Sequence, residues 1–177
     1  SVIAFGIFIV PSAIIVLLIM LDSKGPSFYW SRRIGRNGVP FMIPKFRTMY
    51  VNAPERPTEN LTNPEIYITR IGRLLRATSL DEIPQFFSVL RGDMSLVGPR
   101  PVLVSQIELN QMRADLGIHR LRPGITGWAQ INGRDDISIE DKVRLDWEYL
   151  ERQSFCFDLL IIWKTCFYVV RQKGVWH

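Results

Sequence analysis

The chain has 177 residues, a formal net charge of +5, and 47% hydrophobic residues. That length suffices for one domain with a real core, and the basic balance favours an anionic partner such as phospholipid headgroups or nucleotide phosphates. Its two cysteines, Cys156 and Cys166, lie about 15 Å apart along one predicted helix and cannot bond to each other, which excludes a disulfide framework and suits a reducing cytoplasm.

The chain begins with an uncharged apolar run, residues 1–21. As a helix rising about 1.5 Å per residue, this run reaches roughly 30 Å, one bilayer thickness, so we predict a membrane helix here. Pro11 and Ser12 lie at its centre, and a proline inside a helix removes a hydrogen bond and kinks the chain. The residues alone leave open whether the kinked helix spans the bilayer or re-enters the same face.

Residues 22–177 are predicted to form a helix-rich α/β domain. Basic residues follow the apolar run at once, which places this domain on the cytoplasmic face by the positive-inside tendency. Two strands are predicted at 27–34 and 40–47, because an Asn-Gly turn signal at Asn37 separates them. In the second strand, Lys45 and Arg47 share one face, because side chains alternate along a strand.

Residues 76–101 hold the densest run of unusual chemistry. Ser79 and Glu82 match a capping box ahead of an apolar run, so Asp81 and Glu82 are predicted to open a short helix. In the plain interpretation they only cap that helix. In the functional one, the helix dipole keeps a carboxylate anionic, as a nucleophile towards phosphorus or a magnesium ligand.

Two arginines flank this pair of carboxylates. Arg76 lies before it, and Arg100 lies between two prolines that restrict its backbone. Both can supply the positive charge that phosphoryl transfer requires.

The remaining elements follow from hydrophobic periodicity, caps and turn residues. Helices are predicted at 64–78, 102–115, 139–153 and 155–172, and loops at 50–63 and 117–134. The last helix is strongly apolar but contains Asp158 and Lys164, so it either lies on the membrane surface or is a buried core helix. In the second loop, Trp128 either stacks on a base or fills the core.

Three sequence blocks occur in a characteristic order: KFRTM at 45–49, SLDEIPQFFSVLRGDMSLVGPRP at 79–101, and RPGITGWAQINGR at 122–134. Together they resemble the bacterial sugar transferases, the monotopic polyprenyl-phosphate phosphoglycosyl transferases. The resemblance implies transfer of a sugar 1-phosphate from a UDP-sugar to polyprenol (undecaprenyl) phosphate with release of UMP. This would be the first membrane step of surface glycan assembly.

The resemblance also implies roles for particular residues. Asp81 would attack the β-phosphorus to form a covalent aspartyl phospho-sugar intermediate, and Asp81 or Glu82 would hold Mg²⁺. Pro11 and Ser12 would bend a re-entrant helix in the bacterial inner membrane. The implied substrate-binding residues are Lys45, Arg47, Arg76, Arg100, Arg122 and Arg134.

The expected partners are the two substrates, membrane lipid and a possible second copy of the chain. A nucleic-acid partner is not expected, because no stacking aromatics are interleaved with the basic residues in a recognisable module. The alternative is a non-catalytic basic module that docks on anionic lipid, which charge and apolar ends support equally well.

Overall fold

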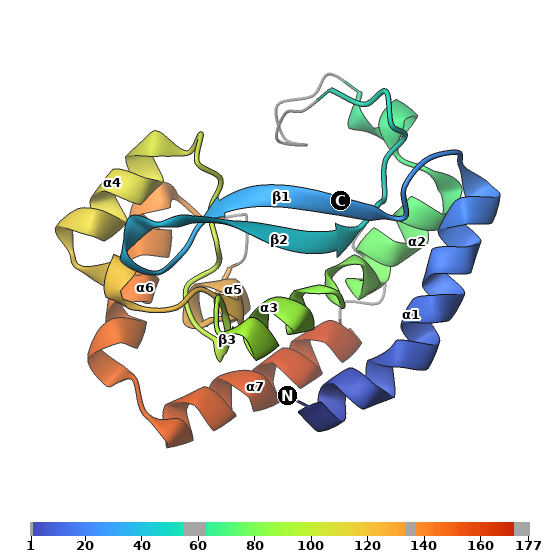
Figure 1. Cartoon of the computed structure of the whole chain (residues 1–177). Helices are drawn as coiled ribbons and strands as arrows, with labels where there is room; N and C mark the ends of the chain where they lie inside the picture. The colour runs from blue at the N-terminus through green and yellow to red at the C-terminus, as the bar shows by residue number, and fades with distance from the viewer. Residues whose placement is uncertain (1, 55–62, 134–136, 172–177) are drawn as a thin grey trace. The chain divides into compact units, whose positions relative to one another are not determined.

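The computed structural model describes residues 2–54, 63–133 and 137–171 (Figure 1). The described residues divide into two compact units, the first from residues 2–30, 44–54 and 63–86, the second from residues 31–43, 87–133 and 137–171. Helices predominate, and two small two-stranded sheets complete the fold. The prediction of a helix-rich α/β fold is therefore confirmed.

In the first unit, helix α1 (Val2–Asp22) continues through Pro11. One stripe of the helix faces the core, where Ile15 and Ile19 are buried four residues apart, about one helical turn. They pack with Phe46, Leu75 and Ile83. These side chains come from α1, from a strand and from the segment around the carboxylates, so one small core holds the elements of the first unit together.

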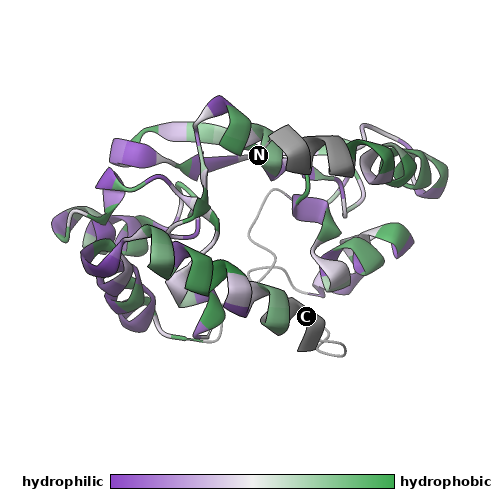
Figure 2. Ribbon diagram, turned by 90° about the horizontal axis from the view of Figure 1, so that it is seen from below, coloured by the Kyte–Doolittle hydropathy of each residue, from purple (hydrophilic) through white to green (hydrophobic). Residues whose placement is uncertain are grey.

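Beyond this stripe, the described part of α1 exposes mostly apolar side chains, and its hydrophobic colouring is visible in Figure 2. The exposed side chains are Ile9, Val10, Ile14, Leu17, Leu18, Met20 and Leu21. Within the part of the chain that the structure describes, no helix combines the length and apolar content needed to cross a bilayer.

The predicted hairpin is confirmed. Strand β1 (Phe28–Ile34) pairs with β2 (Pro40–Phe46), and a 3-10 turn, η1 (Arg36–Gly38), joins them. Asn37 adopts a left-handed conformation with φ 58°, which asparagine tolerates better than most residues. The Asn-Gly signal therefore identified the turn correctly.

The helix expected at 64–78 is shorter than predicted. Residues Pro64–Tyr67 form a 3-10 turn, η3, and helix α2 spans only Arg70–Thr78. An isolated antiparallel bridge between Met49 and Ile68 holds the intervening backbone extended, and Thr69 then caps α2 by accepting from Gly72 N. Pairing with a distant segment overrides the local helical pattern here.

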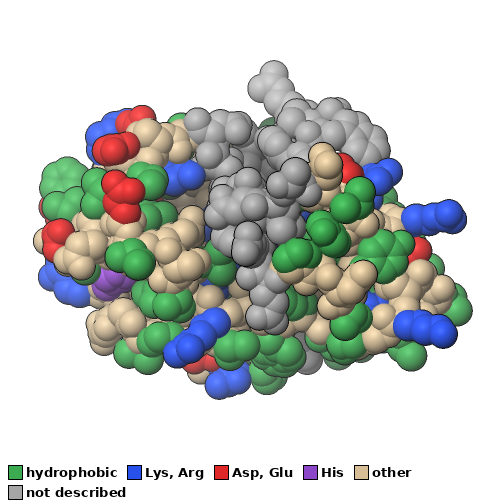
Figure 3. All heavy atoms as spheres, turned by 90° about the horizontal axis from the view of Figure 1, so that it is seen from above, with side chains coloured by type: hydrophobic (Ala, Val, Ile, Leu, Met, Phe, Trp, Pro, Cys, Tyr) green, Lys and Arg blue, Asp and Glu red, His purple; other side chains and the backbone are tan. Residues whose placement is uncertain are grey.

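The second unit is built on a parallel strand pair. Strand β3 (Ser95–Val97) pairs with β4 (Gly124–Thr126), with Ser95 opposite Gly124. One core cluster gathers Val97, Tyr149, Phe157 and Ile161, and a second gathers Val102, Leu109, Ile118 and Val143. Basic, acidic and hydrophobic side chains are interspersed among the described residues on the face seen in Figure 3.

Two predictions for this unit need correction. The helix predicted at 102–115 is the shorter α4 (Ile107–Asp115). The region predicted as a loop at 117–134 contains the 3-10 turn η5 (Ile118–Arg120), strand β4 and the short helix α5 (Trp128–Ile131). The strand was missed because three residues give too short a pattern, and its partner lies almost thirty residues earlier.

The two last helices agree closely with prediction. Helix α6 (Ile139–Arg152) begins at Ser138, whose hydroxyl accepts from Asp141 N. Helix α7 (Phe155–Arg171) packs on the core through one side only, because Ile161 is fully buried whereas Trp163 and Phe167 are exposed. The core alternative thus holds for one face of this helix, and contact of the other face with the membrane stays a prediction.

Candidate active site

The two adjacent carboxylates lie in a tight turn of the first unit. Helix α2 ends at Ser79, which adopts the left-handed conformation with φ 55°, and a 3-10 turn, η4 (Leu80–Glu82), follows at once. The capping-box prediction is wrong: the Ser79 side chain makes no capping hydrogen bond, and the next helix, α3 (Gln85–Arg91), begins beyond Glu82. Asp81 and Glu82 are therefore displayed on a turn between two helices.

Lys45 of β2 reaches both carboxylates. Its Nζ donates to Glu82 Oε1 at 2.7 Å and lies 4.0 Å from Asp81 Oδ2. The three side chains are only 14–19% exposed, so their charges interact in a partly dehydrated setting. The structure thus joins the KFRTM block to the Asp-Glu pair, more than thirty residues apart in sequence.

Burial raises the pKa of Asp81 above its ordinary value. Lys45 acts in the opposite direction, and the adjacent Glu82 raises this pKa further. The expectation that a helix dipole would hold Asp81 as the anion needs correction, because removal from water is the largest influence. A carboxylate with a raised pKa is a stronger base and a better nucleophile once ionised.

Arg76 lies in the last turn of α2, beside the same turn. Its Nε donates to Thr48 Oγ1 at 3.0 Å. Burial lowers its pKa, whereas the field of Asp81 raises it, and a guanidinium stays charged throughout the physiological range. Thr48 was not singled out from the sequence, although it stands in the KFRTM block.

Arg47 takes a different direction from Lys45. Its guanidinium donates to the backbone carbonyls of Ser23 and Lys24, directly after α1. Of the six arginines and lysines predicted to bind substrate, the structure brings Lys45 and Arg76 to the carboxylates in the first unit. Arg100 and Arg122 belong to the second unit, and Arg134 lies outside the described residues.

In the second unit, two of the sequence blocks meet at the strand pair. Gly124 N donates to Pro99 O at 2.9 Å, so the Gly-Pro-Arg-Pro turn lies against the chain that carries Arg122. A Cβ on Gly98 would stand 2.4 Å from the Arg122 carbonyl oxygen, so this close approach requires glycine. The strand pair therefore brings the backbones of the two blocks together.

The backbone carbonyl of Arg100 accepts a hydrogen bond from a residue outside the Gly-Pro-Arg-Pro turn. Arg113 of α4 donates to Arg100 O at 2.8 Å and forms a buried ion pair with Asp146 of α6. Sequence reasoning missed this pair, because only their burial distinguishes them from ordinary charged helix residues. The cavity lined by Arg100, Arg113 and His119 measures about 20 Å³, which holds about one water molecule and no nucleotide.

Trp128 is half-buried and packs against the core of the second unit. Its indole nitrogen donates to Glu148 at 3.0 Å, and its ring packs 5.0 Å from that of Phe157. Lys164 Nζ and the Arg152 guanidinium carbon lie 5.0 and 5.7 Å from the Trp128 ring centre. These cations stabilise the ring where it is.

The expected magnesium ion can be compared with the donor groups present. Among the described side chains, no three carboxylate, histidine or cysteine groups converge as metal ligands. Protein sites for Mg²⁺ in phosphate chemistry commonly use one or two carboxylates, with phosphate oxygens and water completing the shell. The two carboxylates of Asp81 and Glu82 fit this ligand set, and Lys45 is a neighbouring cation rather than a ligand.

Comparison with known proteins adds independent information. Residues 1–172 match the model of the family described as bacterial sugar transferase. The chain is 43% identical over 164 residues to the uncharacterized sugar transferase EpsL of Bacillus subtilis, covering 90% of this chain and 78% of that protein. It is 39% identical to the exopolysaccharide production protein ExoY of Rhizobium meliloti, covering 91% and 77% of the two chains.

A longer relative carries a more specific name. The UDP-glucose:undecaprenyl-phosphate glucose-1-phosphate transferase of Escherichia coli is 40% identical over 160 residues, which cover 86% of this chain and 34% of that protein. The similarity thus extends over nearly all of this chain and about a third of that relative.

Proposed function

Because the chain belongs to the bacterial sugar transferase family, we propose that it moves a sugar 1-phosphate from a UDP-sugar to polyprenol (undecaprenyl) phosphate and releases UMP. The observation that carries this proposal is the partly buried cluster of Lys45, Asp81 and Glu82. A relative named for undecaprenyl phosphate and UDP-glucose supports the substrate class. The chain would act at the first membrane step of surface glycan assembly.

The proposed reaction has two displacements at one phosphorus atom. In the first, a carboxylate oxygen of Asp81 attacks the β-phosphorus of the UDP-sugar. A P–O bond to Asp81 forms, the bond to the bridging oxygen breaks, and UMP leaves with the electron pair. In the second, a phosphate oxygen of the polyprenol phosphate attacks the same phosphorus, expels the Asp81 carboxylate, and yields the polyprenyl diphosphate sugar.

The neighbouring groups have distinct tasks in this scheme. Lys45 orients Glu82 and lowers the cost of ionising Asp81, because its ammonium lies close to both. Arg76 supplies positive charge for the phosphate oxygens. Asp81 and Glu82 would hold Mg²⁺, which when bound neutralises charge on the phosphates.

We also propose that the reaction takes place at the cytoplasmic face of the bacterial inner membrane. One substrate is water-soluble and the other carries a long apolar chain, so the site has to meet both phases. The exposed apolar side chains of α1 favour contact with lipid. In this proposal α1 re-enters the membrane on one side, with its bend at Pro11 and Ser12.

Replacing the nucleophile tests the proposal directly. The full chain is incubated with UDP-sugars labelled at the β-phosphate, with Mg²⁺ and without lipid acceptor, then denatured. Label should stay on the wild-type protein with about one UMP released per site, and Asp81→Asn should lose the label and at least about 10³-fold in turnover. Glu82→Gln is the matched variant, because it keeps the nucleophile and should retain detectable label.

Three results would contradict parts of this scheme. Near wild-type turnover in Asp81→Asn would remove Asp81 as the nucleophile. UMP release that depends on polyprenol phosphate, with no label on the protein, would indicate direct transfer. Binding of the wild type to anionic vesicles that falls steeply with salt, with no turnover of any UDP-sugar, would favour the non-catalytic docking module.

A further inference from the structure

The short segment that follows α1 binds a buried arginine. Arg47 is 6% exposed; its Nη1 donates to Lys24 O at 2.9 Å, and its Nη2 donates to Ser23 O and Ser23 Oγ, both at 2.8 Å. Carbonyl groups at the C-terminal end of a helix lack intrahelical partners and carry the negative end of its dipole. The chain directly after β2 is therefore attached to the end of α1 by a buried cation.

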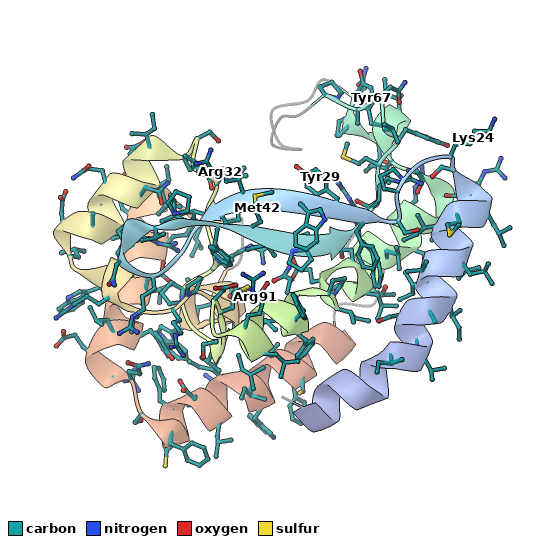
Figure 4. All side chains as sticks on the ribbon, in the orientation of Figure 1. Lys24, Tyr29, Arg32, Met42, Tyr67 and Arg91 are labelled. Carbon is teal, nitrogen blue, oxygen red and sulfur yellow. The ribbon has the colours of Figure 1, made fainter. Side chains whose placement is uncertain are left out.

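The same segment also holds helix α2. Asp22 Oδ2 accepts a hydrogen bond from Ile71 N at 3.0 Å, in the first turn of that helix. A carboxylate at this position satisfies a free amide and is stabilised by the helix dipole. Residues 22–24, which we name the α1 corner, thus bind one neighbour through Asp22 and another through Arg47. Figure 4 labels Lys24 at this corner.

Both attached elements carry groups of the candidate active site. Lys45 lies on β2, which ends at Phe46, one residue before Arg47. Arg76 lies near the C-terminal end of α2, and the turn that carries Asp81 follows that helix. Thr48 joins the two elements: its hydroxyl accepts from Arg76 Nε and its carbonyl from Thr69 N, each at 3.0 Å. A shift of the α1 corner would therefore move both the segment that carries Lys45 and the helix that leads to Asp81.

We infer that Asp22 and Arg47 are positioning residues, and that the α1 corner sets the placement of Lys45 relative to Asp81 and Glu82. Arg47 acts through the backbone of Ser23 and Lys24 rather than by gripping substrate. The inference rests on the proposed function for its effect on turnover, but the contacts between Lys45 and the carboxylates can be measured without it.

The test measures how fast Lys45 is acetylated in the full chain, by mass spectrometry after brief exposure to an amine-specific acetylating reagent. The Lys45 side chain is 19% exposed and its Nζ donates to Glu82 Oε1 at 2.7 Å, so the reagent reaches this nitrogen slowly as long as the contact is kept. Arg47→Gln and Asp22→Asn should speed acetylation of Lys45 by several-fold, on the order of three to ten, while Lys164 in the second unit serves as the internal reference.

Two further variants make the comparison sharp. Ser23→Ala removes one of the three acceptors of Arg47, so it should give a smaller increase and keep the fold even if Arg47→Gln does not. Arg73→Gln is the matched control, because Arg73 is a half-exposed cation on α2 that pairs only with Glu65 among the ion pairs described. It should leave acetylation of Lys45 at the wild-type rate.

Turnover supplies a second readout, because a loss in kcat with little change in KM separates misplacement of Lys45 from a general loss of stability. The corner variants should lower kcat by about 10- to 100-fold, as misplacement of a catalytic group does, while KM for the UDP-sugar changes by less than about threefold. Unchanged acetylation of Lys45 in folded Asp22→Asn and Ser23→Ala would overturn the inference. If the wild type transfers no sugar phosphate, the proposed function fails, and the acetylation rates still decide whether the corner positions Lys45.

Discussion

Asp81 illustrates how a short polar motif takes its chemistry from its surroundings. A carboxylate between a lysine and a second carboxylate, mostly removed from water, has a pKa set by opposing influences, of which burial is the largest. Its folded-state pKa lies above the ordinary value for aspartate, so the ionised carboxylate, which is the nucleophile in the proposed reaction, predominates only when the pH exceeds that raised value. Activity should therefore fall as the pH drops through it.

Replacing Lys45 should shift the pH at which activity falls on the acid side of the pH profile. In Lys45→Met, the nearest cation described beside Asp81 is lost, the pKa of Asp81 rises further, and the acid limb of kcat/KM should shift to higher pH. The measurement is a pH profile of kcat/KM for wild type and variant. Arg73→Met is the control, because that half-exposed side chain pairs only with Glu65 among the ion pairs described. An unmoved limb in Lys45→Met would mean that another group titrates.

At this scale the sequence indicated the candidate site groups but not their environment. Asp81, Glu82 and Lys45 were recognisable from motif blocks, and the structure brings all three together. Neither the burial that raises the pKa of Asp81 nor the partner of Arg47 was predictable. Both depend on segments more than twenty residues away, which local patterns do not encode.

Helix α2 packs very closely, through Gly72, on the backbone of Thr48, just after β2. A Cβ on Gly72 would stand 2.0 Å from Thr48 O, which is backbone and has little room to yield. Gly72 has ordinary helical backbone angles, so its conformation does not require glycine. Glycine is required because the two backbones approach too closely for a Cβ. This contact keeps Thr48 within reach of Arg76.

Gly72→Ala should therefore destabilise the protein, although alanine is normally the better helix former. We expect a loss of about 1–3 kcal/mol in the free energy of unfolding, the usual cost of overpacking, measured by urea denaturation of the full chain. Arg73→Ala, on the exposed side of the same helix, should change the free energy of unfolding by less than about 0.5 kcal/mol. Equal effects of the two changes would show that the backbones can separate cheaply.

Two similar serine patterns show where local prediction succeeds and fails. Ser138 and Ser79 each precede an acidic residue by three positions, yet only Ser138 caps a helix. Ser138 itself has a non-helical backbone, with φ −59° and ψ 163°, and its hydroxyl accepts from the free amide of Asp141. Ser79 directly ends α2 in a left-handed conformation, so its backbone is already committed to stopping one helix.

For the molecule as a whole, the exposed apolar surface of α1 predicts how the chain binds membranes. The full chain should sediment with anionic vesicles at about 0.1 M and about 1 M salt alike, because salt shortens the Debye length from about 10 to 3 Å but does not weaken apolar burial. Leu17→Asp with Leu21→Asp should lower the vesicle-bound partition coefficient by at least about tenfold.

Val39→Asp provides the matched control, since Val39 is an equally exposed apolar residue at the hairpin turn of the second unit. Its partition should equal that of the wild type. Complete release of the wild type by salt alone would show that charge, not apolar contact, holds the chain to lipid.

The division into two units also bears on how the chain folds as it is synthesised. All residues of the Lys45–Asp81–Glu82 cluster lie before Phe87, so the whole cluster can assemble before the ribosome makes the second unit's helices. The tip of the β1–β2 hairpin forms its contacts only after residues 102 and 120 have been made, because Ile34 N donates to Val102 O and Arg36 Nε donates to Arg120 O. A nascent chain paused beyond Phe87 would thus hold its paired carboxylates in place while the tip of its hairpin still lacks partners.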